Sequence, residues 1–249
     1  MKYEIIITAG GTSEKIDNVR KITNSSSGKL GCMIANKLIE LHEEKINKIY
    51  YICSKNSIKP SHEKIKIIEI FDTQDLEMTI RNLLNGNNIN YFIHSMAVSD
   101  YAVDYVTTAE SLALNIENNP GKDILDLICK NKENLTDSKI SSNQENLIIK
   151  LKKTPKIISL IKTISPSTYL VGFKLLDNVS EENLINTAVN LKNRNKCNLV
   201  VANDLENIRN GNHKAFIIKT FDDYITAYGK EDIAKKLIEV MLNDYLKKY

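Results

Sequence analysis

A group of small residues near the start of the chain has the composition of an anion-binding site. Four of the nine glycines fall within the first 31 residues, and the group comprises Gly10, Gly11, Ser26, Gly28 and Gly31. An apolar run precedes the group, and a helical pattern begins at Lys29. Backbone N–H groups at a helix N-terminus attract negative charge. Residues 9–27 also exceed the usual strand-to-helix connection of about 2–6 residues, so we expect a ligand-binding loop.

Two common nucleotide motifs are absent from this segment. A P-loop requires Gly-x-x-x-x-Gly-Lys-Ser/Thr, but Leu30 follows Gly28-Lys29, and Thr23 stands at the first glycine position. The dinucleotide fingerprint Gly-x-Gly-x-x-Gly lacks its first glycine, which is Ser26 here. A triphosphate lying on the backbone is still compatible with the segment. The alternative is that the glycines serve tight turns and a close helix–strand contact.

Further polar and aromatic residues follow other apolar runs. Met96, Ala97 and Asp100 come after the run that ends at His94, while Phe173 and Asn203 end two later runs; these five are candidate ligand contacts. The aromatic ring could stack on a base, and the asparagine could form a hydrogen bond with a ligand. Each could instead be a core, turn or cap residue. His94 lacks serine and aspartate partners at a recognisable spacing, so we interpret it as a packed histidine.

Lys139 lies in a polar stretch that predicts a surface flap. A flap lysine can close over phosphates as a point charge, and the alternative is a solvated surface lysine. Residues 102–146 interrupt the strand and helix pattern with a turn signal, Asn118-Asn119-Pro120-Gly121, and two short helical patterns at 109–116 and 123–130. We therefore predict one domain, residues 1–249, with a projecting insertion or flap at about 102–146.

The remaining elements predict an α/β fold. Expected strands are 4–8, 46–53, 65–70, 90–94, 147–151, 169–173, 199–202 and 215–219, and expected helices are 29–41, 73–84, 155–164, 180–193 and 230–246. Several strands are continuous apolar runs, which is typical of parallel strands covered on both faces. The alternation predicts a doubly wound, mostly parallel Rossmann-like sheet with helices on both faces, and ligands at the carboxyl ends of its strands.

Composition excludes several function classes. The 249 residues carry a net charge of only +3, which gives no case for a nucleic-acid or membrane partner. The four cysteines, Cys32, Cys53, Cys129 and Cys197, form no C-x-x-C pair, so neither a zinc site nor a redox motif is indicated. The chain shows no signal segment and no apolar run of about 18 residues. We expect a protein of the reducing cytoplasm.

Taken together, the ordered segments resemble the phosphopantothenate–cysteine ligase (phosphopantothenoylcysteine synthetase) family. The matching segments are Thr8-Ala9-Gly10-Gly11-Thr12, Ile16-Asp17-Asn18-Val19-Arg20, Thr23-Asn24-Ser25-Ser26-Ser27-Gly28, Ala97-Val98-Ser99-Asp100-Tyr101, Lys139-Ile140-Ser141-Ser142, Leu151-Lys152-Lys153-Thr154-Pro155-Lys156-Ile157, Val171-Gly172-Phe173 and Ala202-Asn203-Asp204-Leu205. The phrases His94-Ser95-Met96 and Lys174-Leu175-Leu176 resemble a free-standing bacterial subgroup. The chain begins at the ligase strand, so we expect the decarboxylation step to belong to a separate phosphopantothenoylcysteine decarboxylase.

The resemblance implies an activity in coenzyme A biosynthesis. The family joins 4′-phosphopantothenate to the amine of cysteine through an acyl-nucleotide, releasing pyrophosphate and then the nucleoside monophosphate. Bacterial members generally use CTP and eukaryotic members ATP, and Mg²⁺ is implied. A homodimer is also implied, because the arginine that matches Arg20 reaches the substrate of the neighbouring subunit.

The resemblance also implies roles for individual residues. Catalytic roles fall on Asn24, which consumes the acyl-nucleotide, and on the flap residue Lys139. The implied substrate-binding residues are Arg20, Asn24, Met96, Ala97 and Asp100. The implied nucleotide contacts are Gly10, Gly11, Ser26, Gly28, Gly31, Phe173 and Asn203. An asparagine amide can donate to an oxyanion without titrating near neutral pH, and an arginine can bind a phosphate with two parallel hydrogen bonds.

Two other function classes stay open as alternatives. A nicotinamide-dependent Rossmann oxidoreductase needs an acidic residue after the second strand to bind the ribose, and Cys53-Ser54-Lys55 offers none. A non-catalytic nucleotide-binding relic would bind nucleotide without turnover. The presence of Asn24, Asp100 and Lys139 disfavours the relic.

Overall fold

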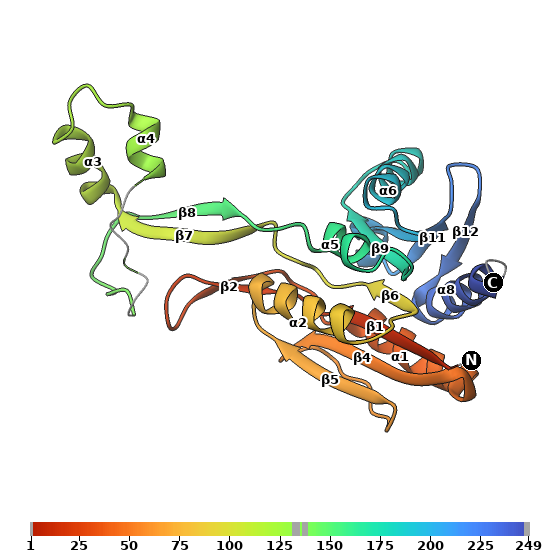
Figure 1. Cartoon of the computed structure of the whole chain (residues 1–249). Helices are drawn as coiled ribbons and strands as arrows, with labels where there is room; N and C mark the ends of the chain where they lie inside the picture. Colours follow the sequence, from red (N-terminus) through yellow and green to blue (C-terminus); the bar gives the residue numbers. More distant parts are fainter. Residues whose placement is uncertain (1, 131–134, 136–138, 247–249) are drawn as a thin grey trace. The chain divides into compact units, whose positions relative to one another are not determined.

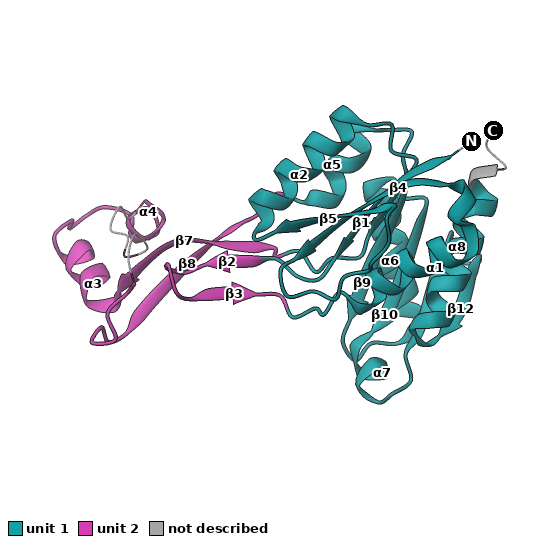
Figure 2. Cartoon of the chain, turned by 90° about the horizontal axis from the view of Figure 1, so that it is seen from below, with its two compact units in different colours: residues 1–12, 25–98, 156–249 teal, residues 13–24, 99–155 magenta. Residues whose placement is uncertain are grey.

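The computed structural model describes residues 2–130, 135 and 139–246 and divides the chain into two compact units. Unit 1 comprises residues 1–12, 25–98 and 156–249, and unit 2 comprises residues 13–24 and 99–155 (Figure 2). Among the described residues, no helix has both the length and the apolar character needed to cross a membrane.

Unit 1 is built on an eight-stranded sheet in the order β12-β11-β10-β9-β6-β1-β4-β5 (Figure 1). The six strands from β5 to β10 are parallel, and β11 and β12 are added antiparallel at one edge. The strands are β1 (Tyr3–Ala9), β4 (Ile46–Ser54), β5 (Ile65–Ile70), β6 (Tyr91–His94), β9 (Tyr169–Leu176), β10 (Leu199–Asp204), β11 (Lys214–Ile218) and β12 (Tyr224–Tyr228).

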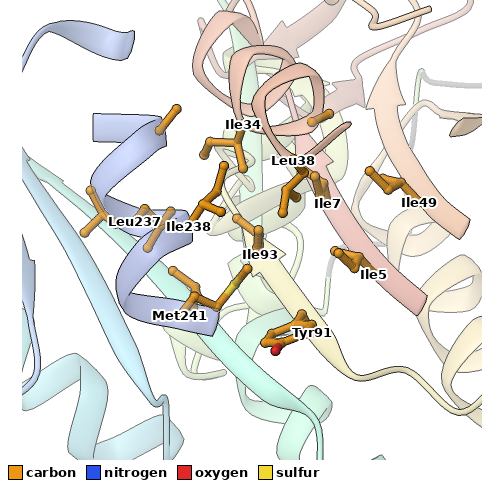
Figure 3. Packing of buried hydrophobic residues seen from close by; sticks show 14 of the residues in the cluster. Ile5, Ile7, Ile34, Leu38, Ile49, Tyr91, Ile93, Leu237, Ile238 and Met241 are labelled. Carbon is orange, nitrogen blue, oxygen red and sulfur yellow. The ribbon is translucent and has the colours of Figure 1, made fainter. Parts of the chain in front are cut away.

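Helices cover both faces of this sheet. The described helical elements of unit 1 are α1 (Lys29–His42), η1 (Glu43–Lys45), α2 (Thr73–Gly86), α5 (Ile157–Ile164), α6 (Glu181–Asn195), α7 (Leu205–Arg209) and α8 (Gly229–Leu246). Figure 3 shows side chains of α1 and α8, among them Leu38 and Ile238, packed on Ile5, Ile7 and Ile93 of the sheet. Side chains of α2, α5 and α6 form a second core with alternate strand residues. Because both faces are buried, the central strands read as continuous apolar runs.

The described residues of unit 2 form two small antiparallel sheets and two short helices. Strands β2 (Ser13–Lys15) and β3 (Lys21–Thr23) form a hairpin. Strands β7 (Tyr101–Thr108) and β8 (Leu147–Lys153) pair with each other, and α3 (Ala109–Glu117) and α4 (Ile124–Cys129) lie between them in the chain. Thr108 and Asp123 cap the two helices with side-chain oxygens that accept backbone N–H groups.

The structure confirms the predicted fold class and corrects three local predictions. Residues 9–27 are not a single long loop, because the β2–β3 hairpin lies within them. The predicted strand at 147–151 exists but pairs with β7 outside the main sheet. The insertion, predicted to carry short helices, also holds most of β7, whose residues change from the exposed Tyr101 at its start to four buried residues at its end.

Candidate functional site

A pocket of about 300 Å³ lies in unit 1 at the carboxyl ends of β1, β6, β9 and β10. Strand β1 pairs with β4 on one side and with β6 on the other, so the strand order reverses there. Open α/β sheets bind ligands at such a point. The pocket is lined by Ser25, Ser26, Ser27, Gly28, Lys29, Leu30, Gly31, Ser95, Met96, Ala97, Phe173, Lys174, Leu175, Asn203, Ile208, His213 and Lys230.

The N-terminus of helix α1 opens into this pocket. Gly28 is the N-cap residue, with a left-handed backbone (φ 72°) that favours glycine, and it supplies no side-chain cap. No acidic residue lies in the first turn of the helix. The partial positive charge of the helix terminus is therefore not offset by a carboxylate of its own first turn, as an anion site requires.

Two of the predicted nucleotide contacts also have a packing reason to be glycine. A Cβ at Gly31 would come within 2.7 Å of the Ala9 Cβ and 2.8 Å of the Ser95 Oγ. A Cβ at Gly10 would overlap the Ser57 hydroxyl at 1.9 Å. The Gly31 contact brings helix α1 against strand β1, as the alternative interpretation of the glycines predicted, and the Gly10 contact packs the end of β1 against the turn after β4. The same close approach places the helix terminus at the pocket.

Backbone hydrogen bonds join the loops that follow β1 and β6. The Ala97 N–H donates to the Gly10 carbonyl at 2.8 Å, and the Thr12 N–H donates to the Ala97 carbonyl at 3.2 Å. Gly11 and Ala97 also form a parallel bridge. Gly10 and Gly11 are thus brought beside Ala97, although neither glycine lines the pocket itself.

His94, at the end of β6, is a packed histidine. Its side chain is 7 % exposed, and its Nδ1 lies 2.8 Å from the Thr8 hydroxyl. Burial lowers the pKa of this imidazole from 6.5 to about 4, because the charged form loses its hydration. The ring is therefore neutral at pH 7.

One wall of the pocket consists of Asn203, His213 and Lys230. Asn203 is only 7 % exposed. Its side-chain amide nitrogen lies 2.8 Å from the Nε2 of His213. The Lys230 ammonium lies 3.2 Å from the Nδ1 of the same ring. Burial and the charge of Lys230 lower the pKa of His213. The wall thus presents a neutral imidazole between a cation and an amide.

A second group of predicted site residues belongs to unit 2 and is organised around Asp17. Its carboxylate accepts the backbone N–H groups of Val19, Arg20 and Ile140, at 2.7, 2.7 and 3.1 Å. The Arg20 Nε donates to it at 3.0 Å, and the Arg20 guanidinium also donates to the Ile140 carbonyl. Burial raises the pKa of Asp17, but these donors outweigh it and lower the pKa from 3.8 to about 2. Lys139, next to Ile140, has an exposed side chain.

Asn24 and Asp100 also belong to unit 2. Asn24 follows β3, is half-buried, and directly precedes the pocket residue Ser25 in the chain. Asp100 is exposed, and its backbone carbonyl accepts the Thr154 N–H at 3.1 Å.

The structure brings together seven of the predicted site residues in one pocket: Ser26, Gly28, Gly31, Met96, Ala97, Phe173 and Asn203. Sequence reasoning missed four charged or titratable residues of that pocket: Lys29, Lys174, His213 and Lys230. A basic residue directly after Phe173 was visible in the sequence. His213 carries no such signal, because it precedes the predicted strand at 215–219 instead of following the carboxyl end of a predicted strand.

Metal-ligating side chains are not clustered in the part of the chain that the structure describes. No group of three His, Cys, Asp or Glu side chains there could hold a metal ion.

Comparison with known proteins gives consistent matches. Residues 1–136 and 131–245 match the family described as the DNA/pantothenate metabolism flavoprotein C-terminal domain. The coenzyme A biosynthesis bifunctional protein CoaBC of Thermococcus kodakarensis is 32 % identical over 242 residues, which is 96 % of this chain and 51 % of that protein. CoaBC of Methanocaldococcus jannaschii is 28 % identical, over 94 % of this chain and 49 % of that protein. The chain spans about half the length of these curated relatives.

Solved structures agree with these matches. The DNA/pantothenate metabolism flavoprotein from Streptococcus pneumoniae superimposes with a TM-score of 0.83 and 35 % identity, covering 98 % of this chain and 99 % of that one. The C-terminal domain of a CoaBC protein shares the fold, with a TM-score of 0.67 and 22 % identity over 97 % of this chain and 96 % of that one. These matches confirm the family resemblance predicted from the sequence: the chain belongs to the DNA/pantothenate metabolism flavoprotein C-terminal domain family.

Proposed function

We propose that this chain is a phosphopantothenate–cysteine ligase of coenzyme A biosynthesis. The observation that carries the proposal is the pocket at the strand-order reversal, which is lined by a helix N-terminus and three lysines, Lys29, Lys174 and Lys230. In the proposed reaction, a carboxylate oxygen of 4′-phosphopantothenate attacks the α-phosphorus of a nucleoside triphosphate, and pyrophosphate leaves. The amine of L-cysteine then attacks the acyl carbon, loses a proton, and displaces the nucleoside monophosphate.

We assign the pocket to the nucleotide. The α1 terminus, Lys174 and Lys230 supply positive charge for the phosphates, and the half-buried Phe173 supplies a ring on which a base can stack. Asn203 supplies a hydrogen bond to the base. We propose CTP as the preferred co-substrate, with ATP as the alternative, on the ground of the bacterial subgroup resemblance. A nicotinamide-dependent oxidoreductase would need a carboxylate at the end of β4 to bind the ribose of its cofactor. The residue at that position is Ser54, whose hydroxyl forms a hydrogen bond with the Ser57 hydroxyl.

We place Mg²⁺ on the triphosphate. Mg²⁺ usually binds through substrate phosphates and one or two carboxylates and keeps several waters, so it needs no cage of protein ligands. This placement agrees with the lack of a three-ligand cluster among the described side chains. The ion would neutralise phosphate charge as pyrophosphate leaves.

Unit 2 carries the residues that we assign to the acyl group. The Asn24 amide would donate to the oxyanion that forms when cysteine attacks, and Lys139 would neutralise the triphosphate during activation. Arg20, Asp100 and the unit 1 residues Met96 and Ala97 would bind 4′-phosphopantothenate. Both units would then form one ligase domain, with residues at about 102–146 as its flap.

We further propose a homodimer in the cytoplasm. Large apolar side chains of unit 2 are exposed, among them Val19 (66 %), Leu114 (57 %) and Leu125 (65 %), and a second copy would cover such a surface. In that dimer, Arg20 would reach the substrate of the neighbouring subunit. The four cysteines are free thiols, as expected in a reducing compartment.

Product analysis tests the proposed reaction. The protein is incubated with 4′-phosphopantothenate, cysteine, Mg²⁺ and either CTP or ATP, and the products are identified by mass spectrometry. We expect phosphopantothenoylcysteine, the nucleoside monophosphate and pyrophosphate, formed faster with CTP. Nucleotide binding without product, from folded protein, would contradict the ligase and favour the non-catalytic relic.

The Asn24→Ala variant separates the two steps of the reaction. We expect the acyl-nucleotide to accumulate, because its formation does not use the Asn24 amide but its consumption does. Asn88→Ala, which removes an exposed amide before β6 and outside the pocket lining, serves as the matched control. Unchanged steady-state turnover in Asn24→Ala would refute the role assigned to the amide.

A further inference from the structure

In the pocket wall formed by Asn203, His213 and Lys230, the chemistry of the three side chains determines which atoms donate and which accept hydrogen bonds. The three side chains come from β10, from the turn before β11, and from the first turn of α8, and all of them line the pocket. Two contacts join them: 3.2 Å between the Lys230 Nζ and the His213 Nδ1, and 2.8 Å between the His213 Nε2 and the Asn203 amide.

The lysine determines which ring nitrogen carries the proton. An ammonium group has only donors, so the Nδ1 of His213 must accept the hydrogen bond from Lys230. In a neutral imidazole, one nitrogen accepts and the other donates. The Nε2 of His213 therefore carries the N–H. Burial and the nearby ammonium lower the pKa of His213, so the neutral ring is favoured at pH 7.

This tautomer conflicts with the amide atom that faces it. The Asn203 atom at 2.8 Å from Nε2 is the amide nitrogen Nδ2, which is also a donor. The Asn203 oxygen Oδ1 is buried, with no hydrogen-bond partner among the described residues. A buried acceptor without a partner is costly. Turning the amide by 180° about its Cβ–Cγ bond exchanges the two atoms, so that the oxygen accepts the His213 N–H. The NH₂ group then occupies the buried position without a protein partner, and a ligand in the pocket is the partner that can satisfy it.

We propose that His213 and Lys230 hold the Asn203 amide with its oxygen on the His213 N–H and its NH₂ group free to bind the nucleotide. The base that this pocket selects then presents a hydrogen-bond acceptor to Asn203, a ring nitrogen or a carbonyl oxygen, and not its exocyclic amino group. His213 and Lys230 are positioning residues in this arrangement. The identity of the ligand as a nucleotide rests on the function proposed above; the direction of the hydrogen bonds does not.

The tautomer is measured on the protein without any ligand. Nitrogen-15 NMR of the imidazole rings distinguishes Nδ1–H from Nε2–H, and His213→Gln identifies the His213 signals by their loss. We expect Nε2–H in the unmodified protein and a shift toward a tautomer mixture in Lys230→Met. Lys235→Met, which alters an exposed lysine of the same helix, is the control and should change nothing. A dominant Nδ1–H form in the unmodified protein would overturn the proposal.

Substitution of Asn203 tests what the amide offers to the ligand. Asn203→Asp keeps the size of the side chain but leaves it with acceptors only. We expect Asn203→Asp to weaken CTP binding at least as much as Asn203→Ala, by about 10- to 100-fold, because an unpaired carboxylate oxygen would face a base acceptor. The weakening should be the same for a CTP analogue that lacks the 4-amino group. Asn203→Asp that binds CTP as the unmodified protein does would overturn the proposal.

The His213 variants provide a rescue. The side-chain N–H of His213→Gln can still donate to Asn203, whereas His213→Leu cannot. We expect CTP affinity to fall about 10-fold in His213→Leu and to be largely retained in His213→Gln. Equal loss in both variants would contradict the positioning role. If the unmodified protein binds no nucleotide, the proposed function fails, and the tautomer measurement still decides the direction of the hydrogen bonds.

Discussion

The two groups of candidate site residues are held in place by different physical means. In unit 1, the pocket residues lie at the carboxyl ends of parallel strands and in the segments that follow them or pack on them, so the register of a buried sheet sets most of their positions. In unit 2, one carboxylate, Asp17, gathers segments that lie 120 residues apart in the chain, namely those of Arg20 and Ile140. The first arrangement is spread over many contacts, whereas the second depends on a few hydrogen bonds to one side chain.

This difference matters for function because the proposed roles divide in the same way. The pocket of unit 1 is assigned to the nucleotide, and unit 2 carries Asn24, Arg20 and Lys139, which are assigned to the acyl group and its activation. A change in unit 2 should therefore reduce turnover while leaving nucleotide binding in unit 1 intact. A change that affects the helix–strand contact of unit 1 should reduce nucleotide binding itself.

The largest effect is expected at Lys139. Its side chain is exposed while the next residue, Ile140, is fixed by Asp17 and Arg20, so the lysine is free to reach a ligand from a held backbone. We expect Lys139→Ala to lower the rate of acyl-nucleotide formation about 10³-fold, the upper range for removing one charge-stabilising donor. Rapid-quench analysis of acyl-nucleotide measures this rate.

The matched control for Lys139 is Lys122→Ala, which removes another exposed lysine of unit 2. That variant should form acyl-nucleotide at the normal rate. Calorimetric titration with CTP should give the same affinity for both variants as for the unmodified protein. Retained acyl-nucleotide formation in Lys139→Ala would count against the flap assignment.

As the pH is lowered, the stability contributed by the buried, neutral His94 of unit 1 should be lost at higher pH than the stability contributed by the Asp17 carboxylate. The unfolded chain protonates His94 near pH 6.5, whereas the folded protein does so only near pH 4, so lowering the pH favours the unfolded chain. The stability lost between these values reaches roughly 3 kcal/mol. Asp17 behaves in the same sense but at lower pH: its folded pKa of about 2 lies below 3.8, so its contribution to stability persists until the pH falls below 3.8 toward 2.

Urea unfolding between pH 7 and pH 4 measures the His94 contribution. His94→Asn keeps an amide near the Thr8 hydroxyl and cannot titrate, so its stability should fall less over this pH range than that of the unmodified protein. Identical pH profiles for the two proteins would show that the burial of His94 does not govern the acid response.

Asp17 is the next test of the comparison. Asp17→Ala removes the acceptor of three backbone N–H groups, so the segments of Arg20 and Ile140 lose their common contact. We expect turnover to fall about 10²-fold, as misplacement of catalytic groups by about 1 Å can cause. Asp17→Asn, which retains one acceptor oxygen, should fall less. Loss of CTP affinity in Asp17→Ala, measured by calorimetry, would show that the two groups of residues are not independent.

Seven of the eight strands of the unit 1 sheet could be predicted from the sequence, because their apolar residues are visible locally; the largely exposed edge strand β12 was missed. Continuous apolar runs such as Ile5-Ile6-Ile7 need no information from distant residues to be recognised as buried strands. The residues that follow these runs then fall at one edge of the sheet by topology alone, which explains why seven predicted contacts meet in one pocket.

The organisation of unit 2 could not be predicted in the same way. The three residues of strand Lys21–Thr23 are all exposed, so the strand shows no apolar pattern in the sequence. Its partner in the hairpin is also only three residues long. The role of Asp17 depends on hydrogen bonds to Ile140, 123 residues away, which no local pattern records. The position of His213 in the pocket lining also depends on a non-local contact, because the segment that carries it is placed by the antiparallel pairing of β11 with β10.

The smallest effect is expected at Gly31, where helix α1 packs against strand β1. Alanine is favoured over glycine within a helix by about 1 kcal/mol. At Gly31, however, the added Cβ would lie 2.7 Å from the Ala9 Cβ, and that neighbour belongs to a buried strand and cannot move aside cheaply. Overpacking of this kind costs about 1–3 kcal/mol. We expect Gly31→Ala to lower the free energy of unfolding by about 1 kcal/mol, measured by urea denaturation.

Gly86→Ala provides the matched control, because a Cβ at this last residue of α2 would meet no atom within 4 Å. That variant should be as stable as the unmodified protein or slightly more stable. Because Gly31 also lines the pocket, displacing α1 moves the helix terminus away from the strand ends and should weaken CTP binding several-fold. If Gly31→Ala were as stable as Gly86→Ala but still bound CTP weakly, the glycine would serve the ligand rather than the helix–strand contact. Loss of both properties together would mean that, in unit 1, packing and the binding site depend on one contact, unlike the arrangement around Asp17.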